Sequence, residues 1–272
     1  MAILTISREM GSEGLQVGKT VAEEMGYDFL NKEKILQELK EDGALWEETA
    51  REMDERKPSL WEKYDWQYRG FIALAQSHML DCALSDKAVI VGRGGNFLLE
   101  GVPYTLRTRI VAPMEARLKK ATEEKTCDDF ICVDAKLARN ILEKADKESE
   151  DFIRAIYGKD WNDPGAYDVT LNMGTLSFEE VIETLKSMLA KRDKFRNADA
   201  ENQLKKRAIA AKINAAILTN PAISIPTLEI LNVGEEILVQ GVVHNAKEHK
   251  LIEDQAKKIA GNVTVKCELH YR

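Results

Sequence analysis

The chain has 272 residues, of which 44% are hydrophobic and 31% are charged, and its formal net charge is −7. These values are typical of a globular protein with one large domain, or with a domain of about 200 residues and a small companion. Residues 205–272 carry ten Lys or Arg and seven Asp or Glu, so their net charge is +3 and that of the preceding residues is −10. The acidic first part argues against nucleic-acid binding.

The cysteines, the histidines and the lengths of the apolar stretches argue against a disulfide-rich protein, a metal-binding protein and a membrane-spanning protein. The four cysteines form no CxxC pair and the four histidines form no ligand cluster, so we expect neither disulfides nor a metal site built by the protein. No apolar stretch is long enough to span a membrane, and no basic leader precedes the first strand pattern. We therefore expect a cytoplasmic protein.

The first element expected is a buried parallel strand over residues 2–7, "AILTIS", followed by a glycine-rich turn and an amphipathic helix over residues 15–25. Gly18-Lys19-Thr20 looks like the end of a phosphate-binding loop, but the pattern GxxxxGK(S/T) fails because position 13 is Glu13. Lys19 also lies about one helical turn beyond Gly14. The favoured interpretation is a surface lysine, and the alternative is a phosphate-binding lysine.

The pattern of residues 27–43 predicts a short extended piece and a helix, and that of residues 44–85 predicts further helix interrupted by Pro58. The apolar run Ala88 to Val91 then predicts a second buried strand that ends at Gly92-Arg93-Gly94-Gly95. Ligands bind at the carboxyl edge of open parallel sheets. Arg93 is therefore a candidate binding residue.

The segments "LRTRIVAP" and "MEARLKKATEEK" predict a third strand and a helix that carries Arg117. A long helical stretch follows over residues 134–161, in which Lys147, Asp151 and Arg154 share one face. A solvated, salt-bridged face is the ordinary explanation for such a charge pattern. An active-site face is the alternative.

A strand, a turn at Gly174 and a helix capped by Ser177 and Glu180 complete the first part of the chain. The alternation of strands and helices predicts an α/β fold, with a three-layer arrangement around a parallel sheet. We expect this domain to span residues 1–190.

The rest of the chain is expected to contain a charged helical connector over residues 191–204 and a small α+β domain over residues 205–272. No glycine occurs between Gly174 and Gly234, which favours a helix, with a break at Asn197-Ala198-Asp199. The small domain has the expected order helix, strand, strand, helix, strand, and we expect it to fold by itself.

Residues 1 to about 190 resemble the cytidylate kinase-like family, which are P-loop nucleoside monophosphate kinases. The resemblance is carried by "ITISREMGSEG", "VGKTVAEEMGYDFLNKEKI", "VIVGRGGNFLL", "RIVAPMEARLKK" and "DKESEDFIRAIYGKDWNDPGAYDVTLN", in that order. It implies a P-loop kinase-type parallel sheet and ATP-dependent phosphoryl transfer, with Mg²⁺, to a nucleoside monophosphate such as CMP or dCMP.

The resemblance also implies roles for residues of the glycine-rich turn and of the helices. Gly11, Ser12 and Gly14 would form the phosphate loop, and Arg117 would lie beside the donor nucleotide. Arg93 would bind the acceptor monophosphate. The physical basis is that phosphoryl transfer depends mainly on positioning and on cations placed at the phosphoryl oxygens.

Lys147, Asp151 and Arg154 match the charged face of the mobile lid in these kinases, and we infer from the match that they are catalytic. The chain also departs from the family pattern at three positions that are usually charged. The uncharged residues found there are Leu15, Asn31 and Ser149. A catalytically impaired nucleotide-binding sensor is therefore the alternative to an active kinase.

Residues 205–272 resemble a BON domain, a small bacterial module associated with phospholipid surfaces or with partner binding. The resemblance rests on "VGEEILVQGVVHNAKEHKLIEDQAKKIAGNVTVKCEL", chiefly on Gly241 and Gly261. Turn and packing geometry also explains these two glycines. The resemblance implies a weak anionic membrane or protein partner, and an interaction module unrelated to nucleotides is the third interpretation of the whole chain.

Overall fold

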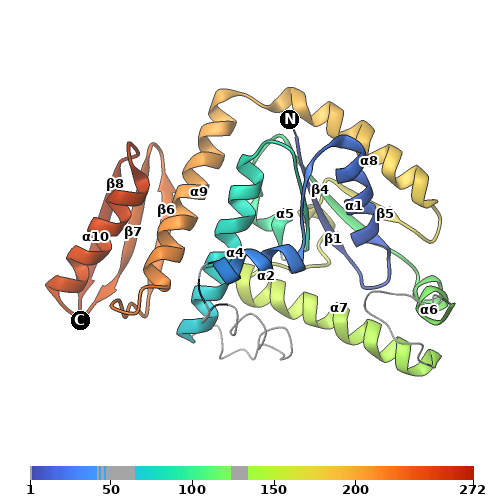
Figure 1. Ribbon diagram of the computed structural model, residues 1–272, viewed down its shortest axis with the longest axis horizontal. Coiled ribbons are helices and arrows are strands. Elements are labelled where there is room, and N and C mark those ends of the chain that lie inside the picture. Colours follow the sequence, from blue (N-terminus) through green and yellow to red (C-terminus); the bar gives the residue numbers. More distant parts are fainter. Residues whose placement is uncertain (1, 42, 44–45, 47–64, 93, 124–133) are drawn as a thin grey trace. The chain divides into compact units, whose positions relative to one another are not determined.

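The computed structural model describes the chain except for residues 1, 42, 44–45, 47–64, 93 and 124–133 (Figure 1). It contains two compact units. The first comprises Met1–Lys34 and Ser85–Arg196, and the second comprises Ile35–Leu84 and Asn197–Arg272.

A five-stranded sheet with the order β2-β3-β1-β4-β5 forms the centre of the first unit, and all its neighbouring strands are parallel. The expected α/β fold with a parallel central sheet is therefore confirmed. The strands expected at residues 2–7 and 88–91 are both buried, because helices flank the sheet. The strands are β1 (Ile3–Arg8), β2 (Asp28–Leu30), β3 (Ala88–Val91), β4 (Thr105–Val111) and β5 (Val169–Asn172).

The helices of this unit are α1 (Gly14–Met25), α5 (Gly95–Leu98), α6 (Met114–Glu123), α7 (Ala135–Tyr157) and α8 (Phe178–Arg192). Helix α2 (Lys32–Glu41) begins in this unit and belongs to the second unit from Ile35 onward. Short 3₁₀ helices cover Pro164–Ala166 and Asp193–Phe195. Ser177 and Glu180 form the capping box expected at the start of α8, since each side chain accepts the other's main-chain N–H.

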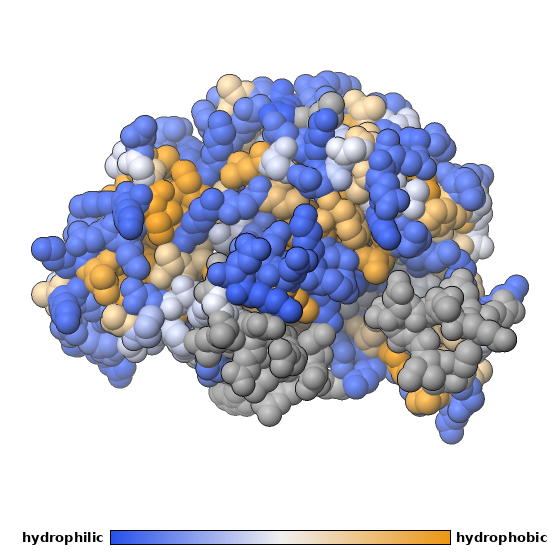
Figure 2. All heavy atoms as spheres, viewed as in Figure 1, coloured by the Kyte–Doolittle hydropathy of each residue, from blue (hydrophilic) through white to orange (hydrophobic). Residues whose placement is uncertain are grey.

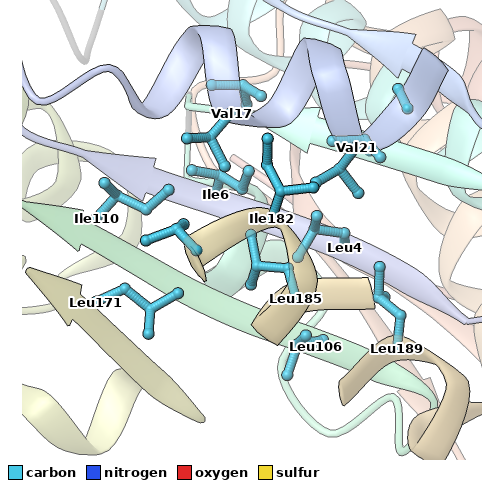
Figure 3. Packing of buried hydrophobic residues seen from close by; sticks show 14 of the residues in the cluster. Leu4, Ile6, Val17, Val21, Leu106, Ile110, Leu171, Ile182, Leu185 and Leu189 are labelled. Carbon is cyan, nitrogen blue, oxygen red and sulfur yellow. The ribbon is translucent and has the colours of Figure 1, made fainter. Parts of the chain in front are cut away.

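Helices α1 and α8 pack together on one face of the sheet, as Figure 3 shows. Val17 and Val21 of α1 and Leu185 of α8 are fully buried in this cluster. Gly18 allows α1 to approach the sheet, because a Cβ there would lie 2.7 Å from Val91 Cγ2. Lys19, the next residue, is exposed. The glycine of Gly18-Lys19-Thr20 thus has a packing role.

The second unit contains a three-stranded sheet with the order β6-β7-β8, in which β6 pairs antiparallel and β8 parallel with β7. Helix α9 begins after Asn197, whose side chain accepts the N–H of Ala200, so the expected break is confirmed. The order helix, strand, strand, helix, strand is also observed. The elements are α4 (Trp66–Leu84), α9 (Ala198–Leu218), β6 (Leu228–Val233), β7 (Glu236–Val243), α10 (Ala246–Ala260) and β8 (Val265–Tyr271).

The compact units follow a different division from the one expected from the sequence. Helix α4, expected within residues 1–190, packs against α9, and Ala73 of α4 belongs to the same buried cluster as Ala210 and Ile213. Residues 191–204 form no separate connector, because α8 ends at Arg192 and α9 begins at Ala198. The small domain therefore shares its hydrophobic core with an earlier helix.

Packing and turn geometry explain the two glycines of the small domain that the sequence singles out. A Cβ at Gly241 would lie 2.4 Å from the carbonyl oxygen of Thr227, and Gly261 has a φ of +59°. Among the described residues, no helix combines the length and apolar character needed to cross a membrane. On the face shown in Figure 2, hydrophilic residues surround small apolar patches.

Candidate functional site

The candidate site lies at the carboxyl edge of the parallel sheet, where the segments after β1, β3 and β4 begin. The segment after β1 runs from Glu9 to Glu13 and leads directly into α1. Glu9 joins it to the end of β4, because its carboxylate accepts the N–H of Ala112 at 3.0 Å. In parallel sheets this edge is where ligands bind.

The loop between β1 and α1 has the conformation of a tight turn, with left-handed φ angles of +77° at Gly11 and +61° at Glu13. The hydroxyl of the buried Ser12 donates to the Glu9 carbonyl at 2.8 Å and fixes the turn. Gly14 lies so close to the preceding strand that a Cβ there would be 2.5 Å from Arg8 Cβ. The structure thus explains Gly11 and Gly14 by backbone conformation and close approach.

The amino end of α1 has no side-chain cap. Glu13 is the N-cap residue, but its side chain makes no capping hydrogen bond and pairs instead with Lys120. The first N–H groups of a helix have no partner within the helix, and the helix dipole favours negative charge there. Such an end, following a glycine-containing turn, is a recurrent phosphate-binding arrangement.

Arg117, from α6, lies against this loop. Its side chain is 7% exposed, and Nη1 donates to the Met10 carbonyl at 3.2 Å and to Asp146 Oδ2 at 2.5 Å. The β-carbon of Arg117 would be 3.5 Å from a Cβ at Gly11. The fold therefore brings together Gly11 and Arg117, which are distant in sequence.

The α7 charged face, which we define as Lys147, Asp151 and Arg154, forms as the helical spacing predicts. Lys147 Nζ lies 3.0 Å from Asp151 Oδ1, and the two cations share a further carboxylate, Glu150, at 3.3 Å and 2.5 Å. The hydrogen bonds to Asp151 and Glu150 raise the pKa of Lys147 above its usual value. All three residues of this face are more than half exposed, and their ion pairs are formed within α7.

Arg93 lies outside the described residues, but its neighbours Gly92 and Gly94 are described. Gly94 has a φ of +78°, and the ring of Tyr157, at the end of α7, lies against it. Tyr157 also stacks on Phe97, with ring centroids 5.7 Å apart. The end of α7 therefore packs against Gly94.

Sequence reasoning missed a buried polar cluster behind the loop. Arg109 of β4 donates to the Trp161 carbonyl and to Asn162 Oδ1, and its guanidinium lies 4.2 Å from the centre of the Trp161 ring. Trp161 Nε1 donates to Ser7 Oγ at 2.7 Å. The cluster, completed by Tyr167, anchors the segment after α7 on β1 and β4. The signal for it was an arginine, Arg109, inside a segment expected to form a strand of the central sheet.

Sequence reasoning also missed Glu9, Asp146 and Glu150, which hold the loop, Arg117 and the α7 cations. Each is one acidic residue among many, so their roles become visible only in the fold.

The three uncharged positions that depart from the family pattern have structural roles. Leu15 packs against the core cluster beneath α1. Asn31 accepts the N–H of Lys34 at 3.0 Å near the start of α2. Ser149 donates to the Ala145 carbonyl within α7. None of the three supplies a charge to the candidate site.

One solved structure shows a likeness in fold to this chain. An uncharacterized protein from Eubacterium ventriosum has a TM-score of 0.54 and 20% identity, and the match covers 70% of this chain and 99% of that one. Shikimate kinase from Acinetobacter baumannii, in complex with shikimate, has a TM-score of 0.38 and 13% identity, with 70% and 94% covered.

Comparisons at the level of sequence give one distant relative and one family. Uronate isomerase from Corynebacterium glutamicum is 26% identical over 113 residues, which are 40% of this chain and only 20% of that protein. The sequence profile of the Cytidylate kinase-like family matches residues 3–175. Because this match spans more than half of the sequence, the chain belongs to the Cytidylate kinase-like family.

Proposed function

We propose that the chain is a nucleoside monophosphate kinase that transfers the γ-phosphoryl group of ATP to CMP, dCMP or a similar acceptor. The observation that carries this proposal is the amino end of α1. It has no side-chain cap, it follows the turn at Gly11, and it lies beside the buried Arg117. Membership of the Cytidylate kinase-like family supports the interpretation of this helix end as a phosphate-binding site.

The donor nucleotide would place its phosphates on the loop. The main-chain N–H groups around Gly11, Ser12 and Gly14 would hold phosphoryl oxygens, and Arg117 would add positive charge at the side of the loop. Among the described residues no cluster of three or more metal-ligating side chains occurs. Mg²⁺ would be held chiefly by phosphate oxygens and water, as it commonly is in kinase sites. It would neutralise negative charge on the transferred group.

The acceptor and the transferred group would be held by cations at the same edge of the sheet. We propose that Arg93 binds the acceptor monophosphate and that the α7 charged face contributes Lys147 and Arg154. Their present ion pairs are exposed and therefore weak. A doubly charged phosphate can displace such carboxylates, so the pairing within α7 is compatible with ligand binding.

A nucleotide-binding sensor without efficient catalysis is the second candidate function. The observation that favours it is the position of Leu15, which packs against the core and supplies no cation to the loop. Lys19 is exposed and lies on the helix beyond the loop. A catalytic cation can be worth a thousandfold or more in rate. Loss of one would preserve nucleotide binding while lowering turnover.

For residues 205–272 we propose a BON-like module that binds an anionic membrane surface or a protein partner weakly. The net charge of +3 supports an electrostatic attraction. Each favourably placed cation contributes roughly 1 kcal/mol near an anionic leaflet. Sedimentation with anionic vesicles at low salt tests the membrane form of this proposal.

A coupled assay of ADP formation with CMP, dCMP, UMP and AMP as acceptors tests the proposed kinase. We expect turnover with a cytidylate and little ADP formation without an acceptor. Replacing Arg117 by Met should abolish turnover with the cytidylate. The matched control Arg139→Met, at an exposed ion pair on α7, should retain this turnover. Nucleotide binding by calorimetry without turnover would favour the sensor. No binding at millimolar ATP-Mg or CMP would refute both.

A further inference from the structure

Asp146 is the residue through which α7 holds the loop between β1 and α1. Its Oδ1 accepts the main-chain N–H of Met10 at 3.0 Å, and its Oδ2 accepts Arg117 Nη1 at 2.5 Å. The same Nη1 donates to the Met10 carbonyl at 3.2 Å. The carboxylate, the guanidinium and the loop peptide therefore form a closed set of hydrogen bonds that joins α7, α6 and the loop.

The direction of the Arg117 guanidinium depends on this carboxylate. The Arg117 side chain is 7% exposed, and its second carboxylate neighbour, Glu9, lies 3.8 Å from Nε. That distance is too long for a hydrogen bond, and Nε has no hydrogen-bond partner among the described residues. A buried guanidinium needs a partner. Asp146 supplies the short, charge-assisted one.

The position of Asp146 on α7 also sets where the α7 charged face lies. Lys147 is the next residue, and Arg154 lies about 12 Å further along the helix axis at 1.5 Å per residue. A continuous helix transmits the position of one residue to the next turns. Fixing Asp146 on the loop therefore fixes both cations relative to the amino end of α1.

We propose that Asp146 is a positioning residue for nucleotide binding. It holds Arg117 and α7 on the loop, so that the loop N–H groups and the α7 cations converge on one phosphate chain. This inference rests on the proposed function. Asp146 itself touches neither the nucleotide nor the reacting atoms, and its contribution is the pre-organisation of groups that do.

The test compares Asp146→Asn and Asp146→Ala with the matched control Glu148→Gln in the full chain. Glu148 is a partly exposed carboxylate on the same helix that pairs with Lys144. Met10 and Arg117 bond to different oxygens of Asp146. Asparagine replaces one of these oxygens by an NH₂ group, which can only donate, so in the same side-chain geometry one of the two hydrogen bonds is lost. Asp146→Glu retains the charge and provides a milder variant, with a smaller loss of the same sign, if the other two do not fold.

Two measurements are made on each variant. Amide hydrogen exchange of the segment containing residues 9–14 is followed without nucleotide, and ADP-Mg affinity is measured by calorimetry. We expect exchange about tenfold faster and binding about tenfold weaker in the Asn and Ala variants. We expect wild-type values in Glu148→Gln.

Unchanged ADP affinity in a folded Asp146→Asn protein would overturn the proposal and leave Asp146 a purely structural residue. Tighter binding would also overturn it, because Asp146 would then compete with phosphate for the loop. Failure of the wild-type chain to bind ADP would instead refute the proposed function, and the role of Asp146 in nucleotide binding with it. The exchange measurement, made without nucleotide, shows separately whether the loop depends on Asp146.

Discussion

Gly18→Ala separates a packing role of Gly18-Lys19-Thr20 from a phosphate-binding role. An added Cβ at position 18 would lie 2.7 Å from Val91 Cγ2 and 3.1 Å from Ile6 Cδ1. Both neighbours are buried, with 2% of their surface exposed. Valine has little freedom to rotate away, since its side chain is branched at Cβ. The methyl group must therefore displace α1 from the sheet.

Two opposing effects decide how much Gly18→Ala changes the free energy of unfolding. Alanine is favoured over glycine inside a helix by about 1 kcal/mol. Overpacking of a well-filled core costs typically ~1–3 kcal/mol. With contacts this short the second effect should prevail, and we expect a net destabilisation of about 1 kcal/mol. For a domain of about 150–250 residues this corresponds to an apparent Tm lower by roughly 2–4 °C.

Thermal unfolding followed by circular dichroism measures this change, with Lys19→Ala as the control. Lys19 is exposed, so its replacement should change the apparent Tm little, and nucleotide affinity should be unchanged. A higher Tm for Gly18→Ala would refute the packing argument. Loss of nucleotide binding in Lys19→Ala would show that this lysine binds phosphate after all.

Three further predictions concern other contacts. Glu150→Gln removes the carboxylate shared by Lys147 and Arg154, so we expect nucleotide affinity in calorimetry to rise about two- to fivefold; weaker binding would show that Glu150 orients the cations. Burial tends to raise the pKa of Asp168, but hydrogen bonds and charge from Arg107 outweigh it and lower that pKa. The stabilisation by ionised Asp168 is therefore present above the unfolded-state pKa and is lost as pH falls through the lower folded-state pKa. Asp168→Asn should lower the apparent Tm at pH 7, and its Tm should approach that of the wild type in acid. A Tm difference that stays constant across pH would contradict this. A chain ending at Arg196 leaves the apolar residues of α4 without α9, so we expect aggregation in size-exclusion chromatography, and a monodisperse, folded product would contradict the shared core.

Local patterns in the sequence were enough to predict much of the first unit. The uncharged run at residues 2–7 and the apolar run at residues 88–91 predicted buried strands, because both faces of a parallel sheet are covered. Ser177 and Asn197 marked helix starts, since a capping side chain bonds to N–H groups only two or three residues away. The glycines at positions 11 and 14 marked the loop, because a positive φ angle and a close approach to the neighbouring strand are also local requirements. Such interactions depend on short stretches of chain.

Tertiary structure decided which distant residues meet, and hence the details of the site. Met10 and Asp146 are 136 positions apart, and no local pattern distinguishes Asp146 from the other acidic residues of α7. Helix α4 packs against α9 because the buried side chains of α4 complete a hydrophobic core whose other members lie beyond residue 197. The sequence therefore determined the secondary-structure elements and the family of the first unit. The packing of those elements determined which residues each charged side chain contacts. Ion pairs and hydrophobic cores form between surfaces that only the complete fold brings together.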